Sequence, residues 1–143
     1  MAATYTAEVL RSRATRKMHD FDPDATAVTA VEWRAISGFG RFLAGFMRTI
    51  GTSAVTFDIA VATDSAGTGA TQVVAHAVGS APDAVEDQLY LECDVEQMRE
   101  VLSTATHWSP RVSFATATDE GAVLTEESDP QNPRTGLTAD IVA

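Results

Sequence analysis

Three histidines, His19, His76 and His107, are the first residues to consider for metal binding or proton transfer. No pair of them has the spacing of metal ligands, and no cysteine or further histidine stands two to four residues from any of them. The sequence therefore predicts no metal site.

Cys93 is the single cysteine, so the chain cannot form an internal disulfide framework. A cysteine can also act as a nucleophile, but only as a thiolate. The neighbouring acids Glu92 and Asp94 would raise the thiol pKa rather than lower it. We therefore expect Cys93 to be a buried structural thiol in a protein made in a reducing cytoplasm.

Acidic segments at 19–24 (HDFDPD) and 126–129 (EESD) could carry carboxylate chemistry. The first imitates the start of a calcium-binding loop but lacks its central glycine and terminal glutamate, which favours a turn-forming acidic loop. The second has no apolar pocket to tune a carboxyl group, which favours a solvated face. Neither pattern predicts catalysis.

The glycine-rich stretch 67–71 (GTGAT) lacks the lysine of a phosphate-binding loop and does not precede a helix. The aromatic residues Trp33, Phe39, Phe42 and Phe46 fit core packing better than a ligand box. The sequence therefore predicts no catalytic residue and no cofactor.

The 143 residues carry a net charge of −10, distributed unevenly. Residues 1–50 hold seven Lys/Arg and five Asp/Glu, whereas residues 51–143 hold three and fifteen, a balance of −12. Such an acidic body would be repelled by nucleic-acid backbones. No apolar run has the length of a membrane span, and the amino terminus lacks a signal-peptide core.

Four basic residues, Arg11, Arg13, Arg16 and Lys17, lie near the amino terminus of this acidic chain. They could dock on an acidic protein surface, including a neighbouring copy of the chain. They could equally belong to a solvated terminus. Both interpretations stay open.

The clearest structural signal is the stretch 54–79. Val55, Phe57, Ile59 and Val61 alternate with smaller or polar residues, the period-two pattern of a strand with one buried face. The glycine-containing segment TDSAGTGA follows, and then QVVAHAVG, rich in β-branched residues. This order predicts a β-hairpin with a long tip.

Residues 38–51 (GFGRFLAGFMRTIG) fit two structures. Their apolar residues recur at helical spacing, but Gly40 and Gly45 would each cost a helix about 1 kcal/mol. As a strand, both faces would be largely apolar, as in a strand buried in a sandwich or under a partner subunit. The pattern alone leaves the choice open.

Shorter patterns complete the expected order. We expect a strand in the second half of 26–37, a strand at 89–93, and a helix from Asp94, capped with Gln97, to about Ser103. A strand at 111–118, a turn at 119–121 and a return at 122–128 predict a second hairpin. The remaining expectations are a strand or extended arm at 4–10, a loop at 12–24 and a final strand or packing tail at 137–143.

These elements predict an all-β protein, an antiparallel, jelly-roll-like β-sandwich with one short helix near 94–103. We expect an amino-terminal arm and loop over 1–25, a sandwich body over 26–128 and a carboxy-terminal tail over 129–143.

Two stretches, 55–70 and 87–98, carry a family resemblance. The first, VTFDIAVATDSAGTGA, and the second, DQLYLECDVEQM, resemble segments of the small β-sandwich head decoration or minor capsid proteins of tailed bacteriophages. The resemblance covers roughly residues 30–125 and favours a strand at 38–51. It leaves both terminal segments outside.

The resemblance implies a non-enzymatic virion protein made in the host cytoplasm. Its expected role is that of a head decoration or cement protein that binds the outer surface of the major capsid shell and stabilises it. The expected partners are the major capsid protein and copies of the chain itself, as a homo-oligomer, with neither direct nucleic-acid contact nor a membrane. Candidate contact residues are Arg11, Arg13, Arg16, Lys17, Phe39, Phe42 and Phe46.

Two alternatives remain open. The protein could instead belong to the head–tail connector or the tail. It could also be a carbohydrate- or ligand-binding β-sandwich in which Trp33, Tyr90 and Trp108 stack on the ligand.

Overall fold

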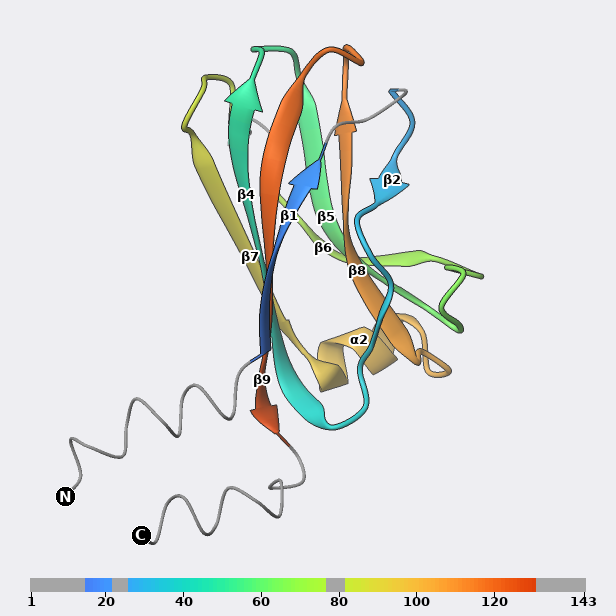
Figure 1. The fold of residues 1–143 in the computed structure, drawn as a ribbon. Coiled ribbons are helices and arrows are strands. Elements are labelled where there is room, and N and C mark those ends of the chain that lie inside the picture. The colour runs from blue at the N-terminus through green and yellow to red at the C-terminus, as the bar shows by residue number, and fades with distance from the viewer. Residues whose placement is uncertain (1–14, 22–25, 77–81, 131–143) are drawn as a thin grey trace, which may run out of the picture.

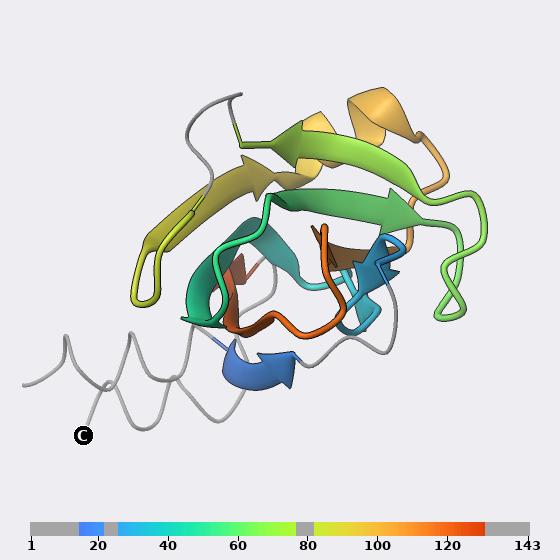
Figure 2. The same ribbon diagram turned by 90° about the horizontal axis from the view of Figure 1, so that it is seen from above.

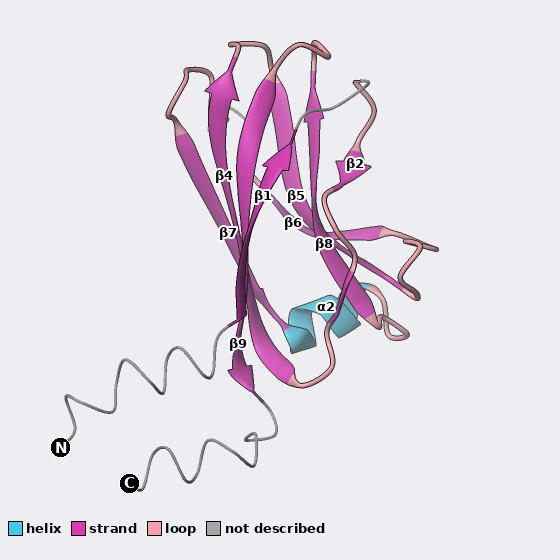
Figure 3. Cartoon of the chain, viewed as in Figure 1, coloured by secondary structure: helices cyan, strands magenta, loops and turns pink. Residues whose placement is uncertain are grey.

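The computed structural model describes residues 15–21, 26–76 and 82–130. Its strands are β1 (Thr15–Phe21), β2 (Thr29–Ala30), β3 (Arg34–Ala35), β4 (Phe39–Ile50), β5 (Val55–Ala62), β6 (Thr71–Ala75), β7 (Gln88–Asp94), β8 (His107–Phe114) and β9 (Glu120–Pro130). The helix α2 (Val95–Val101) follows β7, as Figure 3 shows.

The strands form two antiparallel sheets that pack face to face (Figures 1 and 2). Sheet A has the order β1-β9-β4-β7, and sheet B has the order β2-β8-β5-β6, with β3 also paired to β8. The all-β sandwich predicted from the sequence is therefore confirmed. Among the described residues, no helix has the length and apolar character needed to cross a membrane.

The core lies between the two sheets and is rich in aromatic side chains. On sheet A, Phe42 and Phe46 of β4 are buried. They meet Trp108, Phe57 and Phe114 of sheet B, with ring centroids 5.2–5.8 Å apart. Such contacts, together with the removal of apolar surface from water, hold the two sheets together.

The stretch 38–51 forms a strand, β4, as the resemblance favoured. Phe42, Ala44, Phe46 and Arg48 point inward and are buried. The outward residues are covered less, and Gly45 lies beneath the ring of Tyr90 on β7. A Cβ at this glycine would approach the Tyr90 Cε1 to 2.7 Å, so the absence of a side chain at Gly45 lets the ring lie against the strand.

The hairpin at 54–79 is confirmed, because β5 and β6 pair antiparallel. The Asp64 carboxylate accepts hydrogen bonds from the backbone nitrogens of Ala66 and Thr68, at 2.9 and 3.0 Å. These bonds shape the tip as a turn. The helix after Asp94 is also confirmed, with both hydrogen bonds of the capping box between Asp94 and Gln97.

Two local expectations are wrong, and a third is met in part. Residues 15–21, expected as loop, form β1 and pair along their length with β9. Segment 26–37 has the expected strand in its second half, β3, but it is only two residues long, and a second short strand, β2, precedes it.

The expected hairpin of 111–118 with 122–128 does not form, because β8 belongs to sheet B and β9 to sheet A. The chain crosses between the sheets at 115–119, at the upper end of Figure 1. The expectations for 4–10 and 137–143 lie outside the described residues.

Candidate functional site

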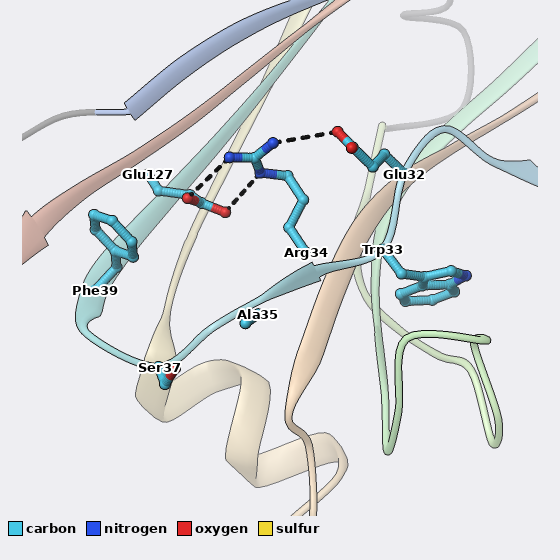
Figure 4. Close-up of a pocket in the computed structure, with 7 residues that line it drawn as sticks. All are labelled: Glu32, Trp33, Arg34, Ala35, Ser37, Phe39 and Glu127. Carbon is cyan, nitrogen blue, oxygen red and sulfur yellow. Dashed lines mark hydrogen bonds and ion pairs between the residues drawn. The ribbon is translucent and has the colours of Figure 1, made fainter.

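A pocket of about 450 Å³ lies where segment 32–39 passes the end of β9 (Figure 4). It is lined by Glu32, Trp33, Arg34, Ala35, Ser37, Phe39 and Glu127. Figure 4 shows the Arg34 side chain extended between the two glutamates, whereas Trp33 points away towards the hairpin tip. There a Cβ on Gly67 would collide with the Trp33 indole.

Glu127 is the centre of the polar contacts at this pocket, and only 3% of its surface is exposed. Its carboxylate accepts hydrogen bonds from Arg34 Nε at 2.9 Å and from the indole Nε1 of buried Trp108 at 2.9 Å. Glu127 lies on sheet A, while Arg34 and Trp108 lie on sheet B. The contacts therefore tie the two sheets together.

Glu32 extends these contacts to the edge strand β1. Its carboxylate accepts hydrogen bonds from Lys17 Nζ at 2.9 Å and from Arg34 at 3.2 Å, and His19 Nε2 lies 3.9 Å away. We refer to Glu32, Arg34, Trp108 and Glu127 as the edge cluster. It links β1, segment 32–35, β8 and β9 along one side of the sandwich.

The protonation states of this region favour structure over acid–base chemistry. The hydrogen bond to Glu127 raises the pKa of Arg34, and the hydrogen bond from Lys17 lowers the pKa of Glu32. Burial lowers the pKa of His19. With these pKa shifts, Arg34 and Glu32 stay charged and the His19 imidazole stays neutral at neutral pH. The Glu127 carboxylate already accepts hydrogen bonds from Arg34 and Trp108.

A second buried ion pair organises the opposite end of the sandwich. Arg48 is fully buried and donates to the Asp119 carboxylate at 2.7 Å and to the Pro82 carbonyl at 2.9 Å. Asp119 also accepts hydrogen bonds from Ser53 and Thr116. Because Ser53, Pro82 and Asp119 come from three separate loops, the pair ties these loops to Arg48 of β4 and is a structural element.

The outer face of sheet A carries an exposed apolar surface that the sequence analysis did not identify. Its residues are Met18, Gly45, Met47, Tyr90, Ala122 and Leu124, which we call the apolar band. They line a groove of about 190 Å³. Met18 and Tyr90 are 63% and 57% exposed, respectively, on the two edge strands. The sequence analysis missed the band because it expected residues 15–21 to form a loop. As strand β1 they place Met18 beside Leu124.

The predicted basic contact residues are only partly described. Arg16 pairs with Glu126, and Lys17 pairs with Glu32, both at the surface of sheet A. Their charges are thus partly compensated within the chain. Arg11 and Arg13 lie outside the described residues, and contact of the four with a partner stays a prediction.

The three phenylalanines predicted as candidate contacts lie in different environments. Phe42 and Phe46 are buried between the sheets, as the core-packing interpretation required. Phe39 is half-buried and lines the pocket in Figure 4. Of the three, Phe39 is the one with a ring partly accessible to a partner.

The aromatic residues proposed for stacking on a ligand are not brought together. Trp108 is fully buried in the core. Trp33 lies by the pocket on the sheet B side, whereas Tyr90 lies on the outer face of sheet A. No shared platform for a sugar ring forms from them.

The cysteine, the possible metal ligands and the acidic segment 126–129 were the remaining candidates for chemistry. Cys93 is buried, and burial, with smaller contributions from Asp94 and Glu92, raises its pKa to about 12, as expected for a structural thiol. Within 15–21, 26–76 and 82–130, no three His, Cys, Asp or Glu side chains cluster as metal ligands. The solvated face expected at 126–129 is wrong for Glu127, because its charge partners come from distant segments.

Comparisons with known proteins give similarities of fold type. No family model and no curated protein matches the sequence. Among solved structures, the protein YomS derived from the SPBc2 prophage is 13% identical, with a TM-score of 0.45, over 80% of this chain and 95% of its own. A chain of the acidic stable capsid of Helicobacter pylori bacteriophage KHP30 is 8% identical, with a TM-score of 0.47, over 84% and 90%.

The Yersinia pseudotuberculosis-derived mitogen is likewise 8% identical, with a TM-score of 0.45, over 87% of this chain and 92% of its own. Since a mitogen and a phage capsid chain are matched to the same degree, we base no functional conclusion on these similarities. The chain itself folds as an antiparallel β-sandwich with two structural ion-pair clusters and an exposed apolar band.

Proposed function

We propose that this chain is a non-enzymatic virion structural protein. More specifically, it is a head decoration protein that binds the outer surface of the major capsid shell and stabilises it through subunit contacts. The proposal joins the resemblance of residues 55–70 and 87–98 to phage head proteins with the surface properties of the sandwich.

The observation that carries the proposal is the apolar band on sheet A. Met18 and Tyr90 are exposed there at the two edges of the sheet, and the half-buried Leu124 and Met47 lie between them along the same groove. Contiguous exposed apolar surface on a stable sheet is typical of a protein-contact site. The edge cluster and the Arg48–Asp119 pair, in contrast, make their contacts within the chain and stabilise the sandwich.

Charge supports an external position. The chain carries a net charge of −10, so packaged DNA would repel it at the inner surface of a shell. This repulsion favours a position on the outer surface.

Mass spectrometry of purified virions tests the proposal. A decoration protein should be present in many copies, in simple proportion to the major capsid protein. A few to tens of copies would indicate a connector or tail protein instead. Absence from purified particles, with the chain found in the lysate of infected cells, would overturn the virion role.

A variant tests whether incorporation into particles depends on the apolar band. Met18→Lys places a charge at the most exposed position of the band, so we expect incorporation into particles to fall about tenfold or more. Val28→Lys is the control, because Val28 is similarly exposed, at 58%, next to β2 of the other sheet. Equal incorporation of both variants would contradict a role for the band.

A further inference from the structure

The apolar band is arranged in rows that cross all four strands of sheet A. One row runs Met18, Leu124, Gly45 and Tyr90 from β1 to β7, because these residues are direct neighbours in the strand register. The next row holds Asp20, Ala122, Met47 and Gln88, and the row on the other side holds Arg16, Glu126, Leu43 and Glu92.

We propose that the band binds a second copy of this chain, with the two sheets A face to face around a two-fold axis. The axis runs parallel to the strands and lies midway between the two sheets, over the line where β9 and β4 adjoin. This inference rests on the proposed function and deepens it: a second copy of the chain covers the band, so the band supports incorporation into particles through pairing of the subunits, and another face contacts the shell. A two-fold contact uses one patch twice, so the patch must be complementary to itself.

The axis places β1 of each copy over β7 of the other. Met18 then lies over Tyr90 of the second copy, which pairs a thioether with an exposed aromatic ring. In the neighbouring row, Arg16 lies over Glu92 of the second copy, so opposite charges meet at both ends of the interface. These residues are exposed in the single chain.

The same axis places β9 over β4. Ala122 then lies over Met47 of the second copy, and Leu124 lies beside Gly45 and the Tyr90 ring that covers it. Small residues thus face large ones, which allows the side chains of two sheets to interdigitate at the usual distance of about 10 Å between packed sheets. Tyr90 needs no hydrogen bond from the partner, because its hydroxyl already donates to Gln88 Oε1 at 2.7 Å.

The charged side chains surround an apolar central row that itself holds no charge. Arg16 pairs with Glu126 and Arg41 lies 3.5 Å from Glu92, whereas Asp20, in the next row at the edge of the sheet, lies over Gln88 of the second copy. Contact with a second copy would join the two pairs into a four-membered group at the rim, where water remains.

Light scattering during size exclusion tests the inference with the 143-residue chain at near-physiological ionic strength. We expect a concentration-dependent dimer. Met18→Glu should weaken dimerisation about tenfold or more, because it places a carboxylate against the face of the Tyr90 ring, near Glu92 of the second copy. Val28→Glu should dimerise as the parent does. A parent chain that stays monomeric over the accessible concentrations would overturn the inference, as would equal dimerisation of the two variants.

Cross-linking tests the orientation. In the proposed dimer, Met18 of one copy faces Tyr90 of the other, whereas the two Met18 residues are offset by three strand spacings, about 14 Å, in addition to the gap of about 10 Å between the sheets. A short bis-maleimide should therefore link Met18→Cys chains to Tyr90→Cys chains in a mixture. Each variant alone should give little product. Cys93 is buried and serves as the unreactive background. Strong linkage of Met18→Cys with itself would overturn the axis.

The two hypotheses fail differently. If the chain is monomeric in solution yet abundant on purified virions, the second-copy inference falls and the proposed function stands. If it dimerises as described but is absent from virions, the proposed function falls and the interface stands.

Discussion

At the scale of single residues, the most demanding positions are those around the buried Asp119. Gly51 has a φ of +87°, and a Cβ there would overlap the Asp119 carboxylate. The carboxylate must stay in place because it neutralises Arg48, which is fully buried. An unpaired buried guanidinium would cost several kcal/mol, so this glycine protects the pair.

Gly51→Ala should therefore destabilise the protein by on the order of 3 kcal/mol. Gly69→Ala is the matched control, because Gly69 also has a positive φ, +67°, but open space around it. It should cost only the backbone strain, roughly 1–2 kcal/mol. Urea unfolding of the three proteins measures the difference. Equal losses would show that the Asp119 contact does not matter.

The pKa of Asp119 is itself a test of this cluster. It is lowered from 3.8 to about 2, with the hydrogen bond from the Ser53 hydroxyl as the largest cause. The ionised carboxylate therefore stabilises the fold fully above about pH 4. This contribution is lost as the pH falls towards 2, because the unfolded chain binds the proton first.

Ser53→Ala should raise the pKa of Asp119, so the acid-induced loss of stability should be smaller than in the parent. A carboxyl-carbon NMR titration follows Asp119 directly. Ser65→Ala, at the exposed hairpin tip, is the control and should leave the titration unchanged. An unaltered Asp119 titration in Ser53→Ala would speak against the hydrogen bond as the cause.

At the scale of elements, β4 shows how one stretch can fit two periodicities. Its apolar residues are spaced as on a helix, yet both faces of the strand need them. The inner face packs on sheet B, and the outer face contributes Met47 and Gly45 to the apolar band. A strand with two apolar faces matches the helical period by coincidence, so periodicity alone could not decide.

Two adjacent alanine substitutions in β4 test this assignment. Phe46→Ala should cost about 3–5 kcal/mol, because the ring is buried against Phe57 and Phe114. Met47→Ala should cost less than about 1 kcal/mol, since its side chain lies on the outer face. Chemical denaturation compares the two. Similar losses would be inconsistent with alternating faces.

At the scale of the whole molecule, the edge cluster makes the sandwich one cooperative unit. Trp108 belongs to sheet B and donates to Glu127 of sheet A at 2.9 Å, and Phe42 packs on the same indole. Neither sheet can leave the other without exposing this ring and breaking the bond to a buried carboxylate. The two sheets should therefore unfold together.

A single-tryptophan variant, Trp33→Phe, makes Trp108 the only indole and tests this cooperativity. Its emission should begin blue-shifted, because the ring is fully buried. On urea unfolding it should shift to the red in one transition that coincides with the loss of the far-ultraviolet circular dichroism of the strands. Two separated transitions would mean that the sheets unfold independently.

Much of the fold could be read from local patterns. The hairpin of β5 and β6, the strand β7, the capped helix α2 and the burial of Cys93 were all predicted, because each depends on alternation, turn residues or capping residues close in sequence. The sandwich class followed from their order.

The pairing of distant segments was decided by the tertiary structure. Strand β1 has little alternation of its own and forms because β9 offers an edge. Strands β8 and β9 look like a hairpin, yet the chain between them crosses from sheet B to sheet A. Both outcomes depend on which sheet has an unpaired edge, and no short window of sequence contains that information.

The same distinction applies to the candidate sites. The acidity of the chain and the lack of a motif for catalysis or metal binding can be read directly from the order of its residues. Only the tertiary structure brought Glu127 to Arg34 and Trp108, and Met18 to Leu124 and Tyr90. The physical reason is that burial and charge pairing depend on contacts across sheets, between residues that are far apart in the chain.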